Sequence, residues 1–114
     1  MGNGSPPIPG PLTLELIENL SETAALLRRC GEKHWSSWLE RDAERLRRCD
    51  SEGIRHVLSA FGGMGSFNDL LLHPMNGDSI AESEVEALNK LLDERRGRIY
   101  SLAKQISAAM VFED

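Results

Sequence analysis

The sequence is poor in aromatic residues, in cysteine and in long apolar runs, and each scarcity narrows the possibilities. Its 114 residues include three phenylalanines, two tryptophans and one tyrosine, so a core must rest on aliphatic side chains. That bias favours helices over a sheet. Two cysteines, Cys30 and Cys49, are too few for a disulfide framework, which favours reduced thiols in a cytoplasmic protein. No apolar run approaches the roughly 20 residues that a membrane-spanning helix needs.

Excess positive charge is also missing. The formal net charge is −5, and residues 61–114 hold 5 basic and 9 acidic side chains. A protein that binds nucleic acid non-specifically needs a basic field, so we expect no nucleic-acid partner. Because no apolar run is long enough to span a bilayer, we also expect no membrane partner. The acidic second half suits a basic protein surface better.

The apolar residues recur at helical spacing, which predicts an all-α fold with about four helices. Pro- and Gly-rich residues 1–11 predict a disordered tail, followed by a single helical domain over residues 12–114. The predicted helices cover Leu12–Cys30, Glu32–Cys49, the short Ile54–Phe61, and a long last segment from Ser79 or Ser83 to Met110.

Candidate caps mark the helix boundaries. Thr13 would cap the first helix, and Asp50 or Ser51 the third. Ser79 and Ser83 each have a glutamate three residues later, which gives two competing capping boxes for the last helix.

An extended connection should separate the third and last helices. His73 precedes a proline and is expected to be extended. Asn76-Gly77 is typical of a turn, and a small hairpin around it is an alternative.

The glycine-rich segment, Phe61–Asp69, is the most unusual stretch. Its exposed amides at Gly63 and Gly65 would suit a phosphate, but the segment follows a helix rather than a strand. We therefore interpret it as a tight loop between helices, with Ser66, Asn68 and Asp69 bonding loop amides.

Two charges interrupt the apolar stripes of the predicted helices. Asp42 lies within the apolar face of the second helix, and Arg95 lies between Leu92 and Ile99 of the last. An isolated charge in a core is costly, so we expect the two to meet, or one to bind loop amides near Gly63–Ser66.

Neither a metal site nor a catalytic set is evident. The two cysteines and three histidines, His34, His56 and His73, do not have zinc-ligand spacing. We expect no metal, no cofactor and no catalytic residue. Trp35 and Trp38 are three residues apart on one helix, where one suits the core and the other a partner contact.

The segment Phe61–Asp69, followed by Leu71 and His73, resembles the signature of a family of small uncharacterised bacterial proteins. The pattern of His34, Trp35, Trp38 and Leu39 is consistent with it. The resemblance implies a bacterial cytoplasmic protein and no known activity.

The sequence therefore favours a small non-catalytic protein-binding module, for example an immunity or antitoxin-like neutralising protein. One alternative is a small enzyme or ligand-binding protein with a site along Gly63–His73, using Ser66, Asn68, Asp69 and His73. Another is a structural homodimer that associates through an apolar helix face or through Leu70–Leu72.

Overall fold

The computed structural model describes residues 9–62 and 65–111, and its regular elements are helical. The α-helices are α1 (Pro11–Arg29), α2 (Lys33–Arg47), α3 (Glu52–Ser59) and α4 (Val85–Val111), and three 3-10 turns are η1 (Phe67–Asp69), η2 (Pro74–Asn76) and η3 (Glu82–Glu84). The all-α fold with a short third and a long last helix is confirmed. No strand occurs within the described ranges, so the hairpin alternative is wrong.

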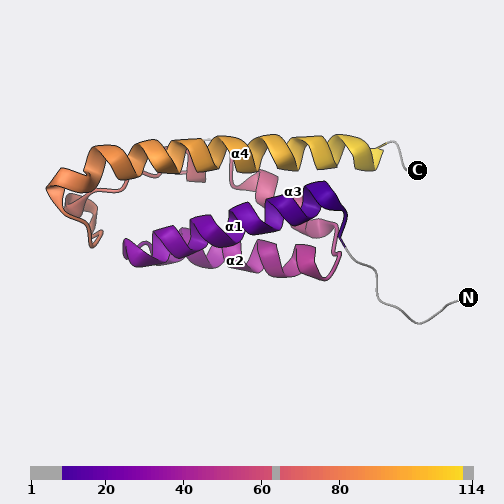
Figure 1. Cartoon of the computed structure of the whole chain (residues 1–114), viewed down its shortest axis with the longest axis horizontal. Coiled ribbons are helices and arrows are strands. Elements are labelled where there is room, and N and C mark those ends of the chain that lie inside the picture. The colour runs from indigo at the N-terminus through magenta and orange to yellow at the C-terminus, as the bar shows by residue number, and fades with distance from the viewer. Residues whose placement is uncertain (1–8, 63–64, 112–114) are drawn as a thin grey trace, which may run out of the picture.

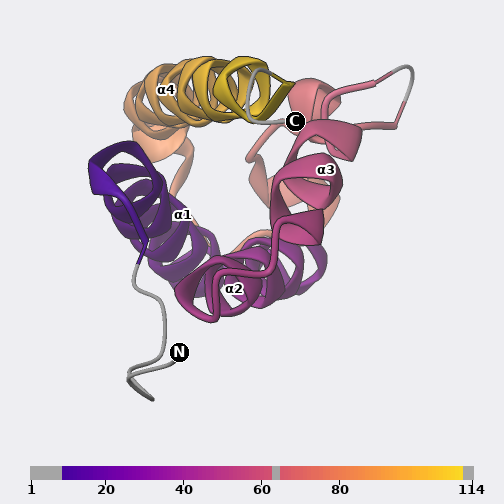
Figure 2. The same cartoon turned by 90° about the vertical axis from the view of Figure 1, so that its right-hand side faces the viewer.

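The four helices surround a common interior. Figure 1 shows α1 and α2 as an antiparallel pair, with α4 running along the full length of the molecule above them. Viewed end-on, α1 lies between α2 and α4 on one side, and α3 lies between α2 and α4 on the other (Figure 2). Two ion pairs tie α1 to the antiparallel α4, one between Glu15 and Arg98 and one between Glu22 and Arg95.

Aliphatic side chains from all four helices fill the interior. The fully buried members of this core include Leu16, Leu20, Leu27, Leu39, Val57, Leu92, Ile99 and Leu102. The connection between α3 and α4 adds Phe67 and Leu72, which are also fully buried. The connection therefore contributes these two side chains to the core.

Side chains of α4 hold the connection in place. Asn89 accepts a hydrogen bond from Leu72 N and donates one to Leu72 O, both at 2.8 Å. Arg96 donates to Phe67 O at 2.7 Å and to Leu70 O at 2.9 Å. Buried backbone groups must find partners, and here two side chains supply the bonds that a sheet would otherwise give.

Several helix boundaries differ from the predicted ones. α1 begins at Pro11, with Gly10 rather than Thr13 at its N-cap, because proline suits the first helical position. α3 begins at Glu52 and ends at Ser59, whereas the predicted helix covered Ile54–Phe61. The predicted tail falls mainly on residues 1–8, which lie outside the described residues.

Glutamates cap the N-terminal ends of α2 and η3. Glu32 accepts a hydrogen bond from Trp35 N at 2.8 Å. Glu84 accepts one from Ala81 N at 2.8 Å, so the glutamate of η3, and neither Ser79 nor Ser83, caps the start of the last helical segment. Ser79 N instead donates to Cys30 O at 2.7 Å, which fixes the connection to the turn between α1 and α2.

Candidate functional site

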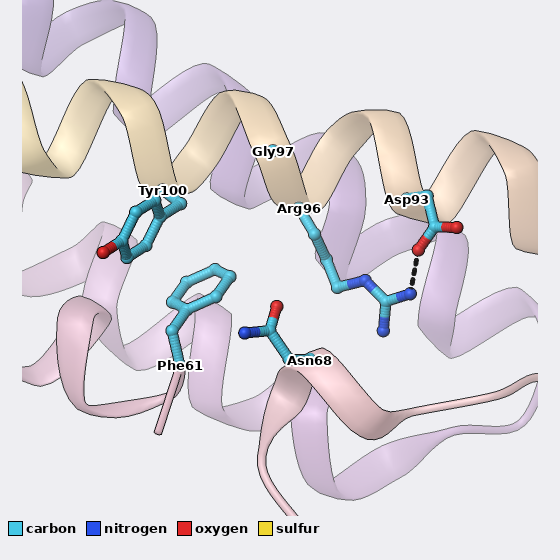
Figure 3. Close-up of a pocket in the computed structure, with 6 residues that line it drawn as sticks. All are labelled: Phe61, Asn68, Asp93, Arg96, Gly97 and Tyr100. Atoms are coloured by element: carbon cyan, nitrogen blue, oxygen red, sulfur yellow. Dashed lines mark hydrogen bonds and ion pairs between the residues drawn. The ribbon is translucent and has the colours of Figure 1, made fainter. Parts of the chain in front are cut away.

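A pocket of about 320 Å³ lies between α4 and the glycine-rich segment. We call it the aromatic pocket; it is lined by Phe61, Asn68, Asp93, Arg96, Gly97 and Tyr100. Figure 3 shows the Phe61 ring facing Tyr100, and the Asn68 amide pointing between Phe61 and Arg96. The two ring centroids are 5.2 Å apart, and Tyr100 is 42% exposed. The pocket thus combines accessible aromatic surface with amide and carboxylate groups.

Gly97 opens the α4 side of the aromatic pocket. A Cβ added at this position would meet no atom within 4 Å. A glycine inside a helix costs about 1 kcal/mol relative to alanine. Since no neighbouring atom within the described structure requires a glycine here, its effect is to leave room above the pocket.

The charge of Arg96 is already compensated within the fold. Its side chain is only 9% exposed and pairs with Asp93, in addition to its bonds to two carbonyl groups of the connection. Its Cζ also lies 5.8 Å from the centre of the Phe67 ring. Arg96 therefore builds the pocket wall, and offers little free charge to an anionic ligand.

The glycine-rich segment forms only part of the predicted amide network. Asp69 accepts a hydrogen bond from Gly65 N at 2.8 Å, and Gly65 has a positive φ of 76°. Ser66 Oγ is buried without a partner among the described residues, and Asn68 faces the aromatic pocket instead. Gly63 lies outside the described residues.

His73 is used locally and does not line the aromatic pocket. Its Nδ1 accepts a hydrogen bond from Met75 N at 3.0 Å, and its backbone N–H donates to the Asp78 carboxylate. The structure therefore does not bring His73 together with Asn68 in one pocket, which the enzyme alternative required. The backbone of His73 is extended, as the following proline predicted.

Asp42 is fully buried, but its partner is His56 rather than Arg95. Asp42 Oδ1 lies 2.5 Å from His56 Nδ1, and the Trp38 ring stacks on the His56 ring with centroids 4.2 Å apart. Burial raises the pKa of the Asp42 carboxyl, while its contacts with His56 act in the opposite direction. The pair is an oriented imidazole with a carboxylate behind it, an arrangement suited to proton transfer or to ligand binding.

Arg95 lies on the other side of the molecule. Its side chain is 35% exposed and donates to Glu22 at 2.8 Å. The expected contact between Asp42 and Arg95 is wrong, and the buried arginine of α4 is Arg96. The sequence signal for Arg96 is its alignment with Asn89, Asp93 and Tyr100 on one face of the helix.

A close crossing of α3 over α2 brings His56 to Asp42. A Cβ added at Gly53 would lie 2.9 Å from Leu46 Cδ2 and 3.2 Å from Arg45 Cβ. The missing side chain lets α3 approach α2, and His56 lies one turn further along α3. Sequence reasoning missed His56 because its contact joins two helices that the pattern alone does not orient.

The two tryptophans divide between the interior and the His56 contact. Trp35 is 9% exposed and packs 5.2 Å from the Phe67 ring. Trp38 is half-buried, and its indole Nε1 is buried without a hydrogen-bond partner among the described residues. Because its ring stacks on the His56 ring, Trp38 helps to orient that imidazole.

Other predicted contacts are limited by burial. In Leu70–Leu72, Leu71 is 55% exposed whereas Leu72 is fully buried, so the run does not form one continuous contact face.

Burial also raises the pKa of the Cys30 thiol. Across the described ranges, no cluster of three metal-ligating side chains forms, and no helix has both the length and the apolar character to cross a membrane.

Comparison with known proteins gives one match. Residues 28–81 match a family described as "Domain of unknown function (DUF6966)". The matched segment includes Asp42, His56 and Phe67, whereas Gly97 and Tyr100 of α4 lie beyond it. No curated protein and no solved structure matches the chain.

Proposed function

We propose that this chain is a small bacterial cytoplasmic protein-binding module. Its contact site is the aromatic pocket, and its occupant is a basic side chain presented by a partner protein. The observation that carries the proposal is the pocket itself, in which Gly97 leaves open space beside two accessible aromatic rings.

The chemistry of the lining favours a cation. The faces of Phe61 and Tyr100 attract a lysine or arginine side chain through the ring quadrupole. The Asn68 carbonyl oxygen and the Asp93 carboxylate are hydrogen-bond acceptors at the same pocket. Because Arg96 is compensated by Asp93 and by backbone carbonyls, it opposes a cation less than a free arginine would.

The net charge extends this preference beyond the pocket. The chain carries a formal charge of −5, with most of the acidic excess in residues 61–114. Complementary charge steers association and raises the rate at which a basic partner arrives. A protein that neutralises a basic toxin, as an immunity or antitoxin-like protein does, is one concrete form of this function.

Site-specific cross-linking tests the proposal. A photo-reactive residue at position 68 faces the pocket, and one at Met75, which is 88% exposed, serves as the matched control. We expect a partner protein to cross-link in host cells from position 68 and not from position 75. The cross-linked partner peptide should contain a lysine or arginine at the contact.

A pocket-filling variant distinguishes specific from incidental cross-linking. Gly97→Leu places a side chain in the open space and retains a good helix former. We expect it to remain folded by circular dichroism and to lose the cross-link. Cross-links that persist in this variant would contradict the proposal, and cross-links between two copies of the chain would support the homodimer alternative instead.

A further inference from the structure

A second pocket lies beside His56, between α2 and α3. It encloses about 250 Å³ and is lined by Arg45 of α2 and by Glu52, Arg55, His56 and Ser59 of α3. We call it the histidine pocket. It shares no lining residue with the aromatic pocket.

The imidazole at this pocket is held in a single orientation. Asp42 Oδ1 contacts Nδ1 at 2.5 Å, and Trp38 covers one face of the ring. Nε2 is therefore the ring nitrogen left for a ligand. The His56 side chain is 29% exposed and lines the pocket, whereas Asp42 behind it is fully buried.

A purely structural role accounts poorly for this arrangement. Burying a carboxylate is costly, and replacing a buried ion pair with apolar residues is often neutral or stabilising. Asp42 Oδ2 is moreover buried without a hydrogen-bond partner among the described residues. Perturbed, buried titratable groups beside a pocket are characteristic of binding and catalytic sites.

The charges around the pocket favour an anion. Among the described residues Arg45 has no carboxylate within ion-pair distance, and Arg55 lies 3.9 Å from Glu52 at the pocket edge. Although burial raises the pKa of Asp42, the positive charges of Arg45 and Arg41 act on it in the opposite direction. Two guanidinium groups and an imidazole match the several oxygens of a phosphate group.

We infer that the histidine pocket binds a phosphate group, with Arg45, Arg55 and His56 as the ligand-contacting groups. Because His56 Nδ1–H donates to the Asp42 carboxylate, Nε2 donates to a phosphate oxygen in the doubly protonated, imidazolium form of the ring. Asp42 and Trp38 are positioning residues that hold the imidazole. Glu52 is the competing negative charge, which draws Arg55 away from the ligand. The inference is independent of the aromatic pocket and of the protein partner proposed for it.

Nuclear magnetic resonance on the full chain tests the inference. Inorganic phosphate is added at constant ionic strength, with chloride as the reference anion, while the imidazole signals of His56 are followed. We expect saturable shifts with phosphate and none with chloride. Absence of saturable shifts would overturn the inference.

Variants that remove a charge at the pocket should change the phosphate affinity in predictable directions. Arg45→Gln and Arg55→Gln should each weaken phosphate binding about five- to tenfold, since each removes a charge-assisted hydrogen bond. Glu52→Gln should tighten it roughly twofold to threefold, because a like charge is removed. Arg48→Gln, whose side chain is 68% exposed and does not line the pocket, is the matched control. Equal affinities in all four variants would show that only general charge attracts the ion.

A second ligand separates two sources of the phosphate group. Adenosine monophosphate carries the same group on an organic molecule. Tighter binding of this monoester than of inorganic phosphate assigns the site to organic phosphates, and equal binding assigns it to the free ion. Either assignment requires the loss of affinity in Arg45→Gln, and binding that survives this substitution contradicts the inference.

Discussion

Asp42 on α2 and Arg96 on α4 are both buried charges, yet the fold holds them in different ways. Arg96 is bonded to Phe67 O, Leu70 O and the Asp93 carboxylate. Asp42 has a single partner, His56, and one of its two oxygens is left without a hydrogen bond among the described residues. Arg96 therefore has several hydrogen-bond partners, whereas the hydrogen-bonding capacity of Asp42 is only partly used.

The partners explain the difference. Arg96 is bonded mainly to backbone carbonyls, so it supplies what the irregular connection cannot supply for itself. Asp42 is bonded to an imidazole that is partly exposed and lines a pocket. We infer that Arg96 mainly stabilises the fold, and that Asp42 orients the His56 imidazole for binding at the histidine pocket.

Removing Arg96 should have the largest effect on stability. Arg96→Met keeps much of the side-chain volume but leaves Leu70 O without its donor, and leaves Phe67 O with only the longer bond from Leu70 N at 3.3 Å. A buried carbonyl without a partner costs about 1–3 kcal/mol and the lost bond to Phe67 O adds about 1 kcal/mol, so we expect a loss of roughly 3 kcal/mol. Urea unfolding followed by circular dichroism measures it.

Arg95→Met is the matched control for this loss. Arg95 is the neighbouring residue, is 35% exposed and, within the described ranges, forms an ion pair with Glu22 alone. Exposed ion pairs contribute about 0–1 kcal/mol, so its loss should be small. Similar losses in the two variants would show that the bonds to the connection are not what makes Arg96 important.

Removing Asp42 should have the next largest effect. Asp42→Ala leaves His56 Nδ1 without its partner and opens space next to α3, at an expected cost of about 2 kcal/mol. The same urea titration measures this cost. A neutral or stabilising result would mean that the buried carboxylate is a net cost to the fold, which would strengthen the case for a role in binding.

The pH dependence of stability tests the same residue by another route. Because burial raises the folded-state pKa of Asp42 above its ordinary value of 3.8, its contribution favours folding at low pH. That contribution is complete below the ordinary value and is lost as pH rises through the raised pKa. Asp42→Asn lacks this titration, so its unfolding free energy relative to the native chain should rise with pH over that window. A constant difference would contradict the raised pKa.

Alanine substitutions at Gly53, near Asp42, and at Gly97, next to Arg96, should change the stability in opposite directions. Gly53→Ala forces α3 away from α2 at Leu46 and Arg45, with an expected loss of about 1 kcal/mol. Gly97→Ala meets no atom within 4 Å and should gain up to about 1 kcal/mol from helix propensity. Thermal unfolding compares the two. A loss at Gly97 would show that this glycine is required by the fold rather than by the pocket.

The helices were predictable because their apolar stripes depend on local spacing. The choice between Arg95 and Arg96 was not. At 100° per residue the two straddle the stripe between Leu92 and Ile99, roughly 50° to either side. Only the tertiary structure determines that α1 lies beside Arg95 and the connection beside Arg96.

The sites follow the same rule. Asp42 was recognisable as a charge in an apolar stripe, but its partner depends on the crossing at Gly53. The connection was expected to be extended, whereas its turns depend on hydrogen bonds from Asn89 and Arg96 of a helix that comes later in the chain. Patterns within one element were informative, and contacts between elements were not.

The smallest expected effect concerns Cys49, in the turn that ends α2. Gly31 after α1 and Cys49 after α2 occupy the same position of the same helix-ending motif, with φ values of 84° and 59°. In each, the next amide bonds back to the helix, Glu32 N to Leu27 O and Asp50 N to Arg45 O. Glycine adopts this conformation without a side-chain penalty, so Cys49→Gly should stabilise the chain by about 0.5–1 kcal/mol, measured by urea unfolding. A loss would mean that the Cys49 side chain makes contacts worth more than the backbone strain, and that α2 is held by this side chain as well as by the crossing at Gly53.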